Sequence, residues 1–507
     1  MLRQFSGKGT IALLTTLLLG GCAISPVTLT EDEVTAGAQD KLARVTSEQE
    51  PIAGSIDLYN AMARALKYNL DHKVEIYESS LRVRELDLAH FNLLPNVVAN
   101  AGYAGRDNPL ASSSFNLATN TQNFGASTSQ DQRLRTGDLT FSWHVLDFGL
   151  SYIRARQAAD KALIAEESRR KVVHRLMEDV RTAYWRAFSA QKLVGKLAQL
   201  ERRTRTAIAS ASALSDDRTT SPITAITYKR ELIEIQRILQ ELQRELSVAK
   251  FQLAALMNVK PGAHFTLVAP AAGTQLALPA SDGDGMVRLA IENRPEIRDV
   301  EYRKRINANE AHAALLELLP GVQLFAGPNY DSNAFLLHEH WLSWGAKASW
   351  NVIKVFQYPA RREVVHGQDA VLDQRALALT MAIMTQVHVS RARLAHFKRE
   401  VEIATAYHTT QQELVQSIRS EHAANKVSEQ TLLREELNGA VGEVRLDIAK
   451  SGLQGAYANL IASMGLDPRS GDVSRDGSVA EIAAALRHGG PVPAPTGAPV
   501  KLAAQKE

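Results

Sequence analysis

Few side chains in this sequence are spaced for chemistry. His338 and His340 flank Glu339, but two histidines at positions i and i+2 without a third ligand are more typical of a polar loop than of a metal site. The remaining histidines, of 14 in the chain, are scattered. The sequence contains no recognisable nucleophile–base arrangement and no phosphate-binding glycine loop. We therefore expect no catalytic residue, no metal site, no cofactor and no enzyme activity.

Cys22 is the one residue with a specific chemical prediction. It is the only cysteine among 507 residues, and it follows the apolar segment Ile11–Leu19, which is too short to span a bilayer as a helix. Arg3 and Lys8 supply the positive charge typical of a signal peptide. Leu19-Gly20-Gly21-Cys22 resembles the bacterial lipobox, in which the cysteine is lipidated. We expect a signal peptide at residues 1–21 and palmitate on Cys22; the alternative is a free buried cysteine.

Ala23, the residue after the cysteine, bears on which membrane holds the protein, and the composition bears on whether it binds nucleic acid. By resemblance to lipoprotein sorting, Ala23 in place of aspartate favours the outer membrane over the inner membrane. One lipidated terminus is a supplementary anchor, because a second membrane attachment is usually needed. The net charge is only +3, with Lys and Arg interleaved with Asp and Glu. This composition gives no indication of a nucleic-acid surface.

The sequence is duplicated. Residues 65–102 align without a gap on residues 290–327, at an offset of 225. Further along the chain the offset falls to 207, so that Ser142-Trp143 meets Ser349-Trp350. The 18-residue difference falls between about Tyr103 and Leu139. A duplication of this length predicts two copies of one structural unit.

Each copy is predicted to begin with a helix and to continue into β-strands. The helix ends at a Leu-Pro pair, because proline disfavours helix in the residue before it. Apolar residues then alternate with polar ones, most clearly over Leu139–Val145 and Leu342–Val352. Such alternation over roughly 9–11 residues, with aromatic residues near its ends, is typical of membrane β-barrel strands. The alternative is a hairpin packed on a soluble core. The side chains expected to face lipid are Phe141, Trp143, Trp344 and Trp350.

A surface loop is expected between the two strands of each copy. In the first copy it covers about residues 105–136 and is rich in Ser, Asn, Thr, Gly and Gln. In the second copy it covers residues 331–340. The 18 additional residues therefore lie in the first loop.

A long helical hairpin is expected after the strands. In the first copy the outgoing helix covers about residues 150–214 and would extend roughly 100 Å at about 1.5 Å per residue. Alanine and other apolar residues recur at helical spacing with charged residues between them, which favours helices packed against one another. The predicted turns are Asp216-Asp217-Arg218 and Asn425-Lys426, with helix starts at Ser221-Pro222 and Ser428.

These elements predict six segments along the chain. They are a signal peptide at 1–21, a lipid-anchored tether at 22–55, the first repeat at 56–257, a linker at 258–285, the second repeat at 286–465, and a C-terminal helix with a disordered tail at 466–507.

The order of these segments resembles the TolC family of outer-membrane export channels. The matching stretches are Asn293-Arg294-Pro295, the two Leu-Leu-Pro junctions, and Ser142–Gly149 leading to Arg154 and Arg156. The resemblance implies a mainly α fold with a membrane β-barrel, built as a homotrimer with four strands per chain. Its twelve-stranded barrel would continue into a periplasmic α-helical barrel. Four strands cannot close in lipid, two chains would give a barrel filled by side chains, and three leave room for a pore.

The resemblance also implies a function and partners. The chain would be a passive duct for efflux of small molecules, or for type I secretion of a polypeptide. A periplasmic adaptor protein would link it to an inner-membrane RND or ABC transporter, and the turns at Asp216, Asp217, Arg218, Asn425 and Lys426 would dock the adaptor. The alternative is a lipid-anchored periplasmic coiled coil, structural or adhesive, without a pore. Such a scaffold has no need of amphipathic strands.

One part of the sequence departs from the family pattern. Well-known members carry aspartates just past the second hairpin turn, where they ring the closed entrance. The matching positions here are Thr431 and Arg434, with Thr224 in the first hairpin. Arg434 would form a positive ring if it faces inward; alternatively it points outward and pairs with Glu429, Glu435 or Glu436. Cation selectivity and the usual gating contacts therefore do not carry over.

Overall fold

The computed structural model describes residues 26–47, 49–52, 54–216, 222–269, 282–468, 477–488 and 491–492. Internal contacts divide the chain into residues 1–51 and 52–507. The first unit contains α2 (Glu31–Arg44), which starts with a capping box between Thr30 and Glu33. The predicted signal peptide, Cys22, and residues 270–281 and 493–507 of the predicted linker and tail lie outside the described residues.

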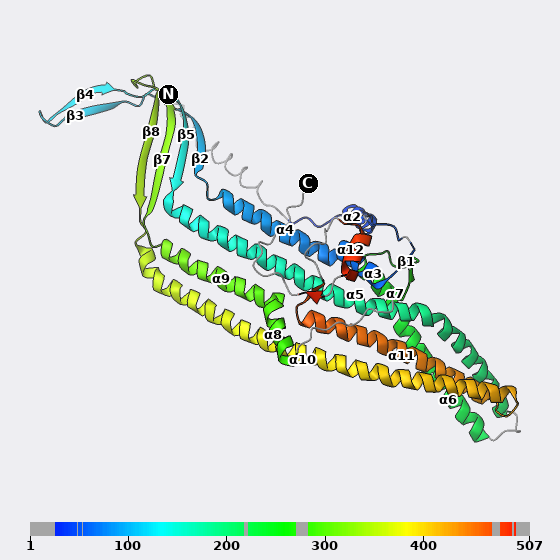
Figure 1. Cartoon of the computed structure of the whole chain (residues 1–507). Coiled ribbons are helices and arrows are strands. Elements are labelled where there is room, and N and C mark those ends of the chain that lie inside the picture. Colours follow the sequence, from blue (N-terminus) through cyan, green and yellow to red (C-terminus); the bar gives the residue numbers. More distant parts are fainter. Residues whose placement is uncertain are drawn as a thin grey trace. The chain divides into compact units, whose positions relative to one another are not determined.

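The second unit contains the predicted duplication, element by element (Figure 1). The helices α3 and α4 recur 225 residues later as α8 and α9, and the hairpin α5–α7 recurs 207 residues later as α10–α11. The first repeat consists of α3 (Leu58–Tyr68), α4 (Leu70–Phe91), β2 (Asn96–Gly105), β5 (Arg133–His144), α5 (Val145–Asp216), α6 (Pro222–Ser247) and α7 (Ala249–Leu256). The second consists of α8 (Gly283–Asn293), α9 (Pro295–Leu316), β7 (Gly321–Asp331), β8 (His340–Ser349), α10 (Ile353–Ala423) and α11 (Glu429–Ser463).

Two local predictions were wrong. The loop at residues 105–136 contains a hairpin, β3 (Ser112–Asn116) paired with β4 (Thr121–Ser127). All its residues are exposed, so no buried face imposes the apolar alternation by which a strand is recognised. The second predicted strand extended to Val352, whereas β8 ends at Ser349. Trp350 therefore lies past the end of the strand.

The four long strands form one antiparallel sheet in the order β2-β5-β7-β8 (Figure 1). Direct cross-strand partners point to the same side of a sheet, so the register assigns each side chain to a face. Val97, Phe141, Ala326 and Trp344 form one row across all four strands. The row Asn100, Asp138, Asn329 and Trp341 lies on the opposite side. The edge strands β2 and β8 have only one neighbour each within the chain.

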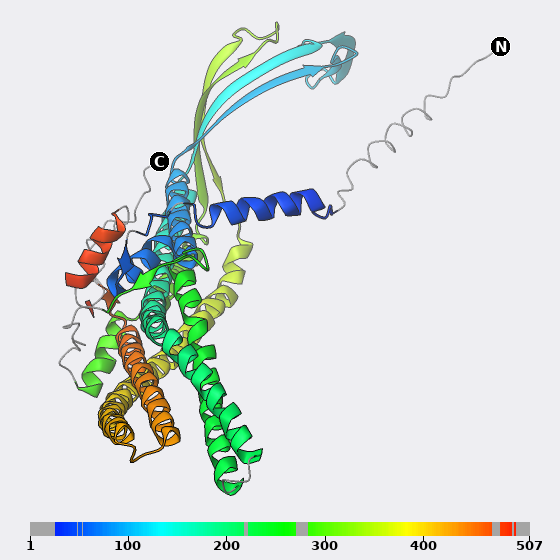
Figure 2. The same cartoon turned by 90° about the vertical axis from the view of Figure 1, so that its right-hand side faces the viewer.

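The helices continue the order of the strands. Each of the four strands joins one helix directly or through a short turn, and the contacting pairs α4–α5, α5–α9 and α9–α10 repeat the strand order. Beyond them, α6 packs on α5, and α11 packs on both α5 and α10. Figure 2 shows the strands at one end of this unit and, at the other end, the ends of α5 and α6 and the turn between α10 and α11. No helix within the described residues is long and apolar enough to cross a membrane.

A small mixed layer covers the middle of α5. It includes α3, α7, α12 (Val479–His488) and the parallel pair β1 (Ser55–Ile56) and β6 (Thr266–Leu267). The pair β9 (Asp467–Pro468) and β10 (Pro491–Val492) completes the described elements. The Tyr184 hydroxyl on α5 donates to one of two carbonyls, that of Ile56 in β1 at 3.1 Å or that of Val268, the residue after β6. The buried side chains of this layer and of α5 form the main hydrophobic core.

Candidate functional site: the strand faces and the hairpin ends

The sheet has one apolar and one polar face. The apolar face carries Val97, Ala99, Ala101, Tyr103, Leu139, Phe141, Trp143, Val322, Leu324, Ala326, Leu342, Trp344, Ala346 and Ala348, as the register and strand alternation place them. On the polar face Asp138 accepts hydrogen bonds from Asn100 at 3.0 Å and from Thr140 at 2.8 Å. Asn329 donates to Ser343 at 2.7 Å on the same face. The sheet can therefore separate an apolar environment from an aqueous one.

The aromatic residues do not all lie where the alternation placed them. Phe141, Trp143 and Trp344 lie on the apolar face, and Trp344 is 79% exposed in the single chain. Trp350 instead donates its indole N–H to the Leu318 carbonyl at 2.9 Å, at the junction of β8 and α10. Trp341, which the sequence pattern did not single out, lies on the polar face opposite Asn329. The contact of the apolar-face aromatics with lipid stays a prediction.

The turn of the second hairpin is fixed by backbone hydrogen bonds. The N–H of Asn425 donates to His422 O at 2.9 Å, and that of Lys426 donates to Glu421 O at 2.9 Å. Asn425 has a φ of 57°, which makes this a Schellman ending with asparagine in the left-handed position. Ser428 then caps α11 by accepting from the N–H of Thr431 at 3.2 Å. Asn425 and Lys426 thus lie in a well-defined turn.

The structure shows the contacts of two predicted entrance residues, Thr431 and Arg434. Thr431 makes a second contact with its cap, because its hydroxyl lies 3.0 Å from that of Ser428. Arg434 pairs with Glu435 at 3.1 Å and with Glu231 on α6 at 3.7 Å. The contact with Glu435 is one of those expected from the outward alternative, while the ring around a three-fold axis stays a prediction. Asp217 and Arg218 lie outside the described residues, as do the side chains of Asp216 and Thr224.

An ionic seam joins the two hairpins, and we define it as Lys192, Lys196 and Arg203 on α5 with Glu436, Glu443 and Asp447 on α11. Lys192 lies 3.3 Å from Glu443 and 3.2 Å from Asp447. Lys196 pairs with Glu443, and Arg203 pairs with Glu436 at 2.6 Å. Arg419 on α10 reaches Glu436 at 2.7 Å. Sequence patterns did not reveal this seam, because its partners are more than 200 residues apart.

Two glutamates of the seam, Glu436 and Glu443, have a lowered pKa and are held in their charged form. Partial burial opposes ionisation of Glu436, but the hydrogen bonds from Arg419 and Arg203 outweigh it and lower the pKa of Glu436. Burial also opposes ionisation of Glu443, and hydrogen bonds and charge from Lys196 and Lys192 lower its pKa in the same way. Because the folded pKa values are depressed, the seam stabilises the fold above the ordinary carboxyl pKa of 4.5 and loses this contribution as the pH falls below it.

We expect the double variant Glu436→Gln/Glu443→Gln to be less stable than the wild type at pH 7 by about 1–2 kcal/mol, since exposed and half-exposed ion pairs contribute about 0.2–1 kcal/mol each. The difference should shrink progressively as the pH falls below 4.5, because the folded-state pKa values of both glutamates are lowered. Thermal unfolding of the detergent-solubilised protein at a series of pH values measures it. Glu413→Gln, an exposed residue of α10, is the control and should change little at any pH. A deficit that does not shrink with falling pH would contradict the seam.

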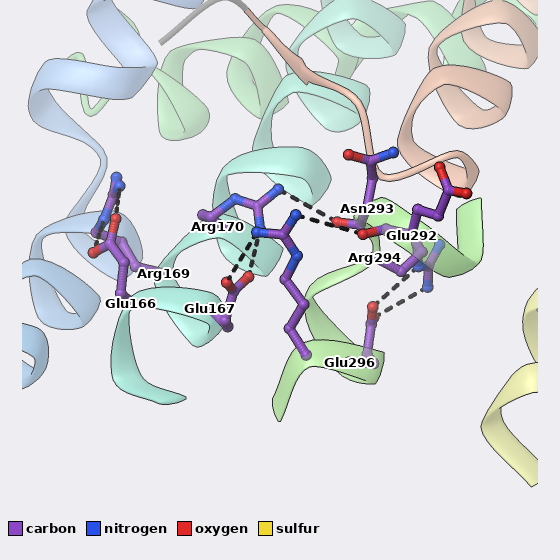
Figure 3. A network of polar contacts seen from close by, with 9 residues as sticks. Glu166, Glu167, Arg169, Arg170, Glu292, Asn293, Arg294 and Glu296 are labelled. Atoms are coloured by element: carbon purple, nitrogen blue, oxygen red, sulfur yellow. Dashed lines mark hydrogen bonds and ion pairs between the residues drawn. The ribbon is translucent and has the colours of Figure 1, made fainter. Parts of the chain in front are cut away.

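A second polar network ties α5 to the junction of α8 and α9 (Figure 3). Arg170 on α5 pairs with Glu167, and it also donates to the carbonyl of Asn293 at 3.4 Å. Arg294 pairs with Glu296 at 3.0 Å and donates, at 3.4 Å, toward the last carbonyls of α11. The Asn293-Arg294-Pro295 stretch, singled out in the sequence, therefore joins α5, the α8–α9 junction and the end of α11.

The structure places no metal site in the part of the chain that it describes. No group of three or more His, Cys, Asp or Glu side chains is arranged there to hold a metal ion. His340 instead stacks on Tyr330 with ring centroids 4.9 Å apart.

Comparisons with known proteins agree with this architecture. The outer-membrane channel OprN matches with a TM-score of 0.61 and 16% identity over 80% of this chain and 89% of its own. The open state of the MtrE outer membrane channel of Neisseria gonorrhoeae matches with a TM-score of 0.60 and 16% identity, over 80% and 88%. The CmeC outer membrane channel of Campylobacter jejuni matches with a TM-score of 0.62 and 11% identity, over 92% and 98%. No protein-family model and no curated protein matches the chain.

The chain has the fold of these outer-membrane channels. The resemblance to the TolC family is thereby confirmed at the level of the fold. The three solved structures named above are outer-membrane channels.

Proposed function

We propose that this chain is the outer-membrane channel of a tripartite export system and that it acts as a passive duct. The observation that carries the proposal is the two-faced sheet joined strand by strand to long helices. An apolar outer face and a polar inner face are what a membrane barrel requires. The helices would continue the polar side away from the membrane as a periplasmic tunnel.

Unpartnered apolar surfaces at both edges of the chain support a ring of several copies. The edge helix α4 exposes Leu70, Val74, Tyr77, Leu81, Leu88 and Phe91, and the opposite edge helix α10 exposes Phe356, Val364, Val371 and Met381. The two edges have different sequences, so their contact would be head-to-tail, and such contacts form a ring when the rotation between copies closes. The edge strands β2 and β8 need the same partner, because open edges are not tolerated in lipid.

Three copies give the smallest ring with a useful pore. Two chains would supply eight strands, whose interior is filled by side chains, whereas twelve strands leave an open lumen. We therefore propose a homotrimer in the outer membrane, with lipid on Cys22 as a supplementary anchor. The hairpin turns around Asp216-Asp217-Arg218 and Asn425-Lys426 would dock a periplasmic adaptor. An inner-membrane RND or ABC transporter would supply the energy, and the cargo would be small molecules or a polypeptide.

Residues near the hairpin ends would shape the entrance. Arg434 and Thr431 replace the aspartates of better-known channels, with Thr224 at the matching place in the first hairpin. Arg434 bridges α11 to Glu231 on α6, so its charge is partly neutralised within the chain. The alternative function, a lipid-anchored coiled-coil scaffold without a pore, offers no role for the exposed apolar face of the sheet.

Disulfide cross-linking tests the ring. In a Cys22→Ser background, we would pair Ala99→Cys on β2 with single cysteines scanned through Leu342, Trp344 and Ala346 on β8. We expect at least one pair to give a covalent trimer at full oxidation, because each chain would join two neighbours. Cysteine pairs on β5 and β8, which are not neighbours in the sheet, serve as the control and should not cross-link. A ladder that stops at the dimer, or a monomer under all conditions, would argue against the ring.

A further inference from the structure

A cavity of about 490 Å³ lies where β2 and β5 meet α4 and α5. Its wall combines aromatic and polar side chains. The rings of Trp143 and Phe148 meet edge to face with centroids 5.9 Å apart, and Arg154, Asp147 and Asn92 line the same space. The volume lies within the range of about 300–1,000 Å³ typical of small-molecule sites.

The cavity presents one cation and one anion to any ligand. The Arg154 side chain is exposed, and no carboxylate in the described ranges forms an ion pair with it. Asp147 is 66% exposed and lies 3.8 Å from Nδ1 of His144. The two charges are therefore available to an outside partner.

In the second repeat the charge of the equivalent arginine is neutralised by glutamates of the same repeat. Arg361 corresponds to Arg154, and it pairs with Glu317 at 2.7 Å and Glu310 at 3.0 Å. In the first repeat the position of Glu317 is occupied by Asn92. The first repeat therefore lacks the acid that pairs with the arginine in the second.

Two further positions around this arginine, those of Glu310 and Lys354, also differ between the repeats. Glu85 corresponds to Glu310, but Arg82 holds it at 2.7 Å. Asp147 stands where the second repeat has Lys354, which binds Glu317 at 3.4 Å. The second repeat thus has a closed ionic cluster at this junction, whereas the first repeat has an open cavity with separated charges.

The cavity lies at the level at which the apolar face ends. Trp143 is the last apolar-face residue of β5, and Asn96 begins β2 on the same level. Aromatic residues gather at the boundary between a membrane and water. If the sheet crosses the outer membrane as proposed, this level is its periplasmic surface, where phospholipid head groups lie.

We propose that this cavity binds the head group of a zwitterionic aminophospholipid of the phosphatidylethanolamine class. Its phosphate would bind Arg154, because guanidinium groups match phosphate oxygens, and its ammonium would bind Asp147. The acyl chains would extend out of the cavity across the rings of Trp143 and Phe148. The inference rests on the proposed function, since the site must lie at a membrane surface. Each trimer would bind three such lipids, all at the first repeat.

Native mass spectrometry of purified full-length trimers with a short-chain phosphatidylethanolamine tests the site. We expect wild-type trimers to bind the lipid, and Arg154→Ala to bind it at least about tenfold more weakly, a change of about 1.4 kcal/mol. Asn92→Glu should have the same effect, because it places the acid of the second repeat beside Arg154 without truncating any side chain. Arg156→Ala is the matched control: Arg156 is an exposed arginine of the same helix that does not line the cavity, and binding should be unchanged.

Three outcomes would overturn the proposal. The first is equal binding by the wild type and by assembled Arg154→Ala or Asn92→Glu trimers. The second is displacement of the lipid by inorganic phosphate at the same concentration, which would assign the site to a free anion. The third is equal affinity for phosphatidylglycerol, which lacks the ammonium. Conductance of the same trimers separates the lipid-site proposal from the proposed channel function. Trimers that conduct but bind no lipid would refute the lipid site and leave the channel proposal standing.

Discussion

Replacing Leu139 by arginine is expected to destabilise the membrane-inserted sheet by about 2–4 kcal/mol, because an arginine at the bilayer midplane costs about that much on the lipid face of a barrel. Leu139 lies on the apolar face near the middle of the paired strands, opposite Ala99. The cost should fall for Phe141→Arg and approach about 0–1 kcal/mol for Trp143→Arg, which is close to the strand end. Denaturant titration of protein refolded into lipid vesicles measures the series.

Thr140→Arg is the matched control for this series. Thr140 is the next residue along β5, and it lies on the polar face within hydrogen-bond distance of Asp138. An arginine there would remain in water and beside a carboxylate, so the sheet should assemble normally. If both faces tolerate arginine equally, the sheet is a soluble hairpin pair and not a membrane wall.

Replacing Gly465 by alanine is expected to cost about 2–5 kcal/mol of folding free energy. Gly465 has a φ of 67°, a conformation that costs a residue with a side chain about 1–2 kcal/mol. A Cβ atom would also lie only 2.8 Å from backbone atoms of Asn293 and Arg294, and such overpacking costs about 1–3 kcal/mol more. The substitution would separate the end of α11 from the junction of α8 and α9. Thermal unfolding of the purified protein in detergent measures the loss.

Gly195→Ala provides the opposite control. Gly195 lies inside α5, and an added Cβ atom would meet nothing within 4 Å. Alanine there should stabilise the protein by about 0.5–1 kcal/mol, because glycine inside a helix is unfavourable. Equal effects of the two substitutions would show that the close approach at Gly465 does not matter for stability.

The duplicated fold was predictable because its signals are local. The Leu-Pro pairs that end the first helices and the alternation of Phe141 and Trp143 with polar neighbours depend on residues adjacent in the sequence. The same local signals failed where no face is buried, as in the β3–β4 hairpin. They also failed at Trp350, whose alternating position continues past the strand because the chain turns into α10 there.

The polar networks could not be predicted, because they depend on how helices pack. Lys192 and Asp447 become neighbours only when α5 lies against α11. Charged residues on a long helix are usually a solvated face, and nothing in their spacing distinguishes the seam from ordinary surface pairs. The same holds for Arg154: in the described part of the chain no carboxylate pairs with it, and this becomes visible only beside the ion pairs of Arg361.

The central claim is that three copies of this chain enclose a continuous water-filled duct. Its most direct test is the conductance of purified full-length trimers in planar lipid bilayers, with polyethylene glycols of increasing size added to gauge the pore. We predict discrete and uniform conductance steps, reduced by small polymers that enter the duct and unaffected by large ones. Trimers that insert stably into the bilayer and carry no current under any voltage or salt would contradict the account.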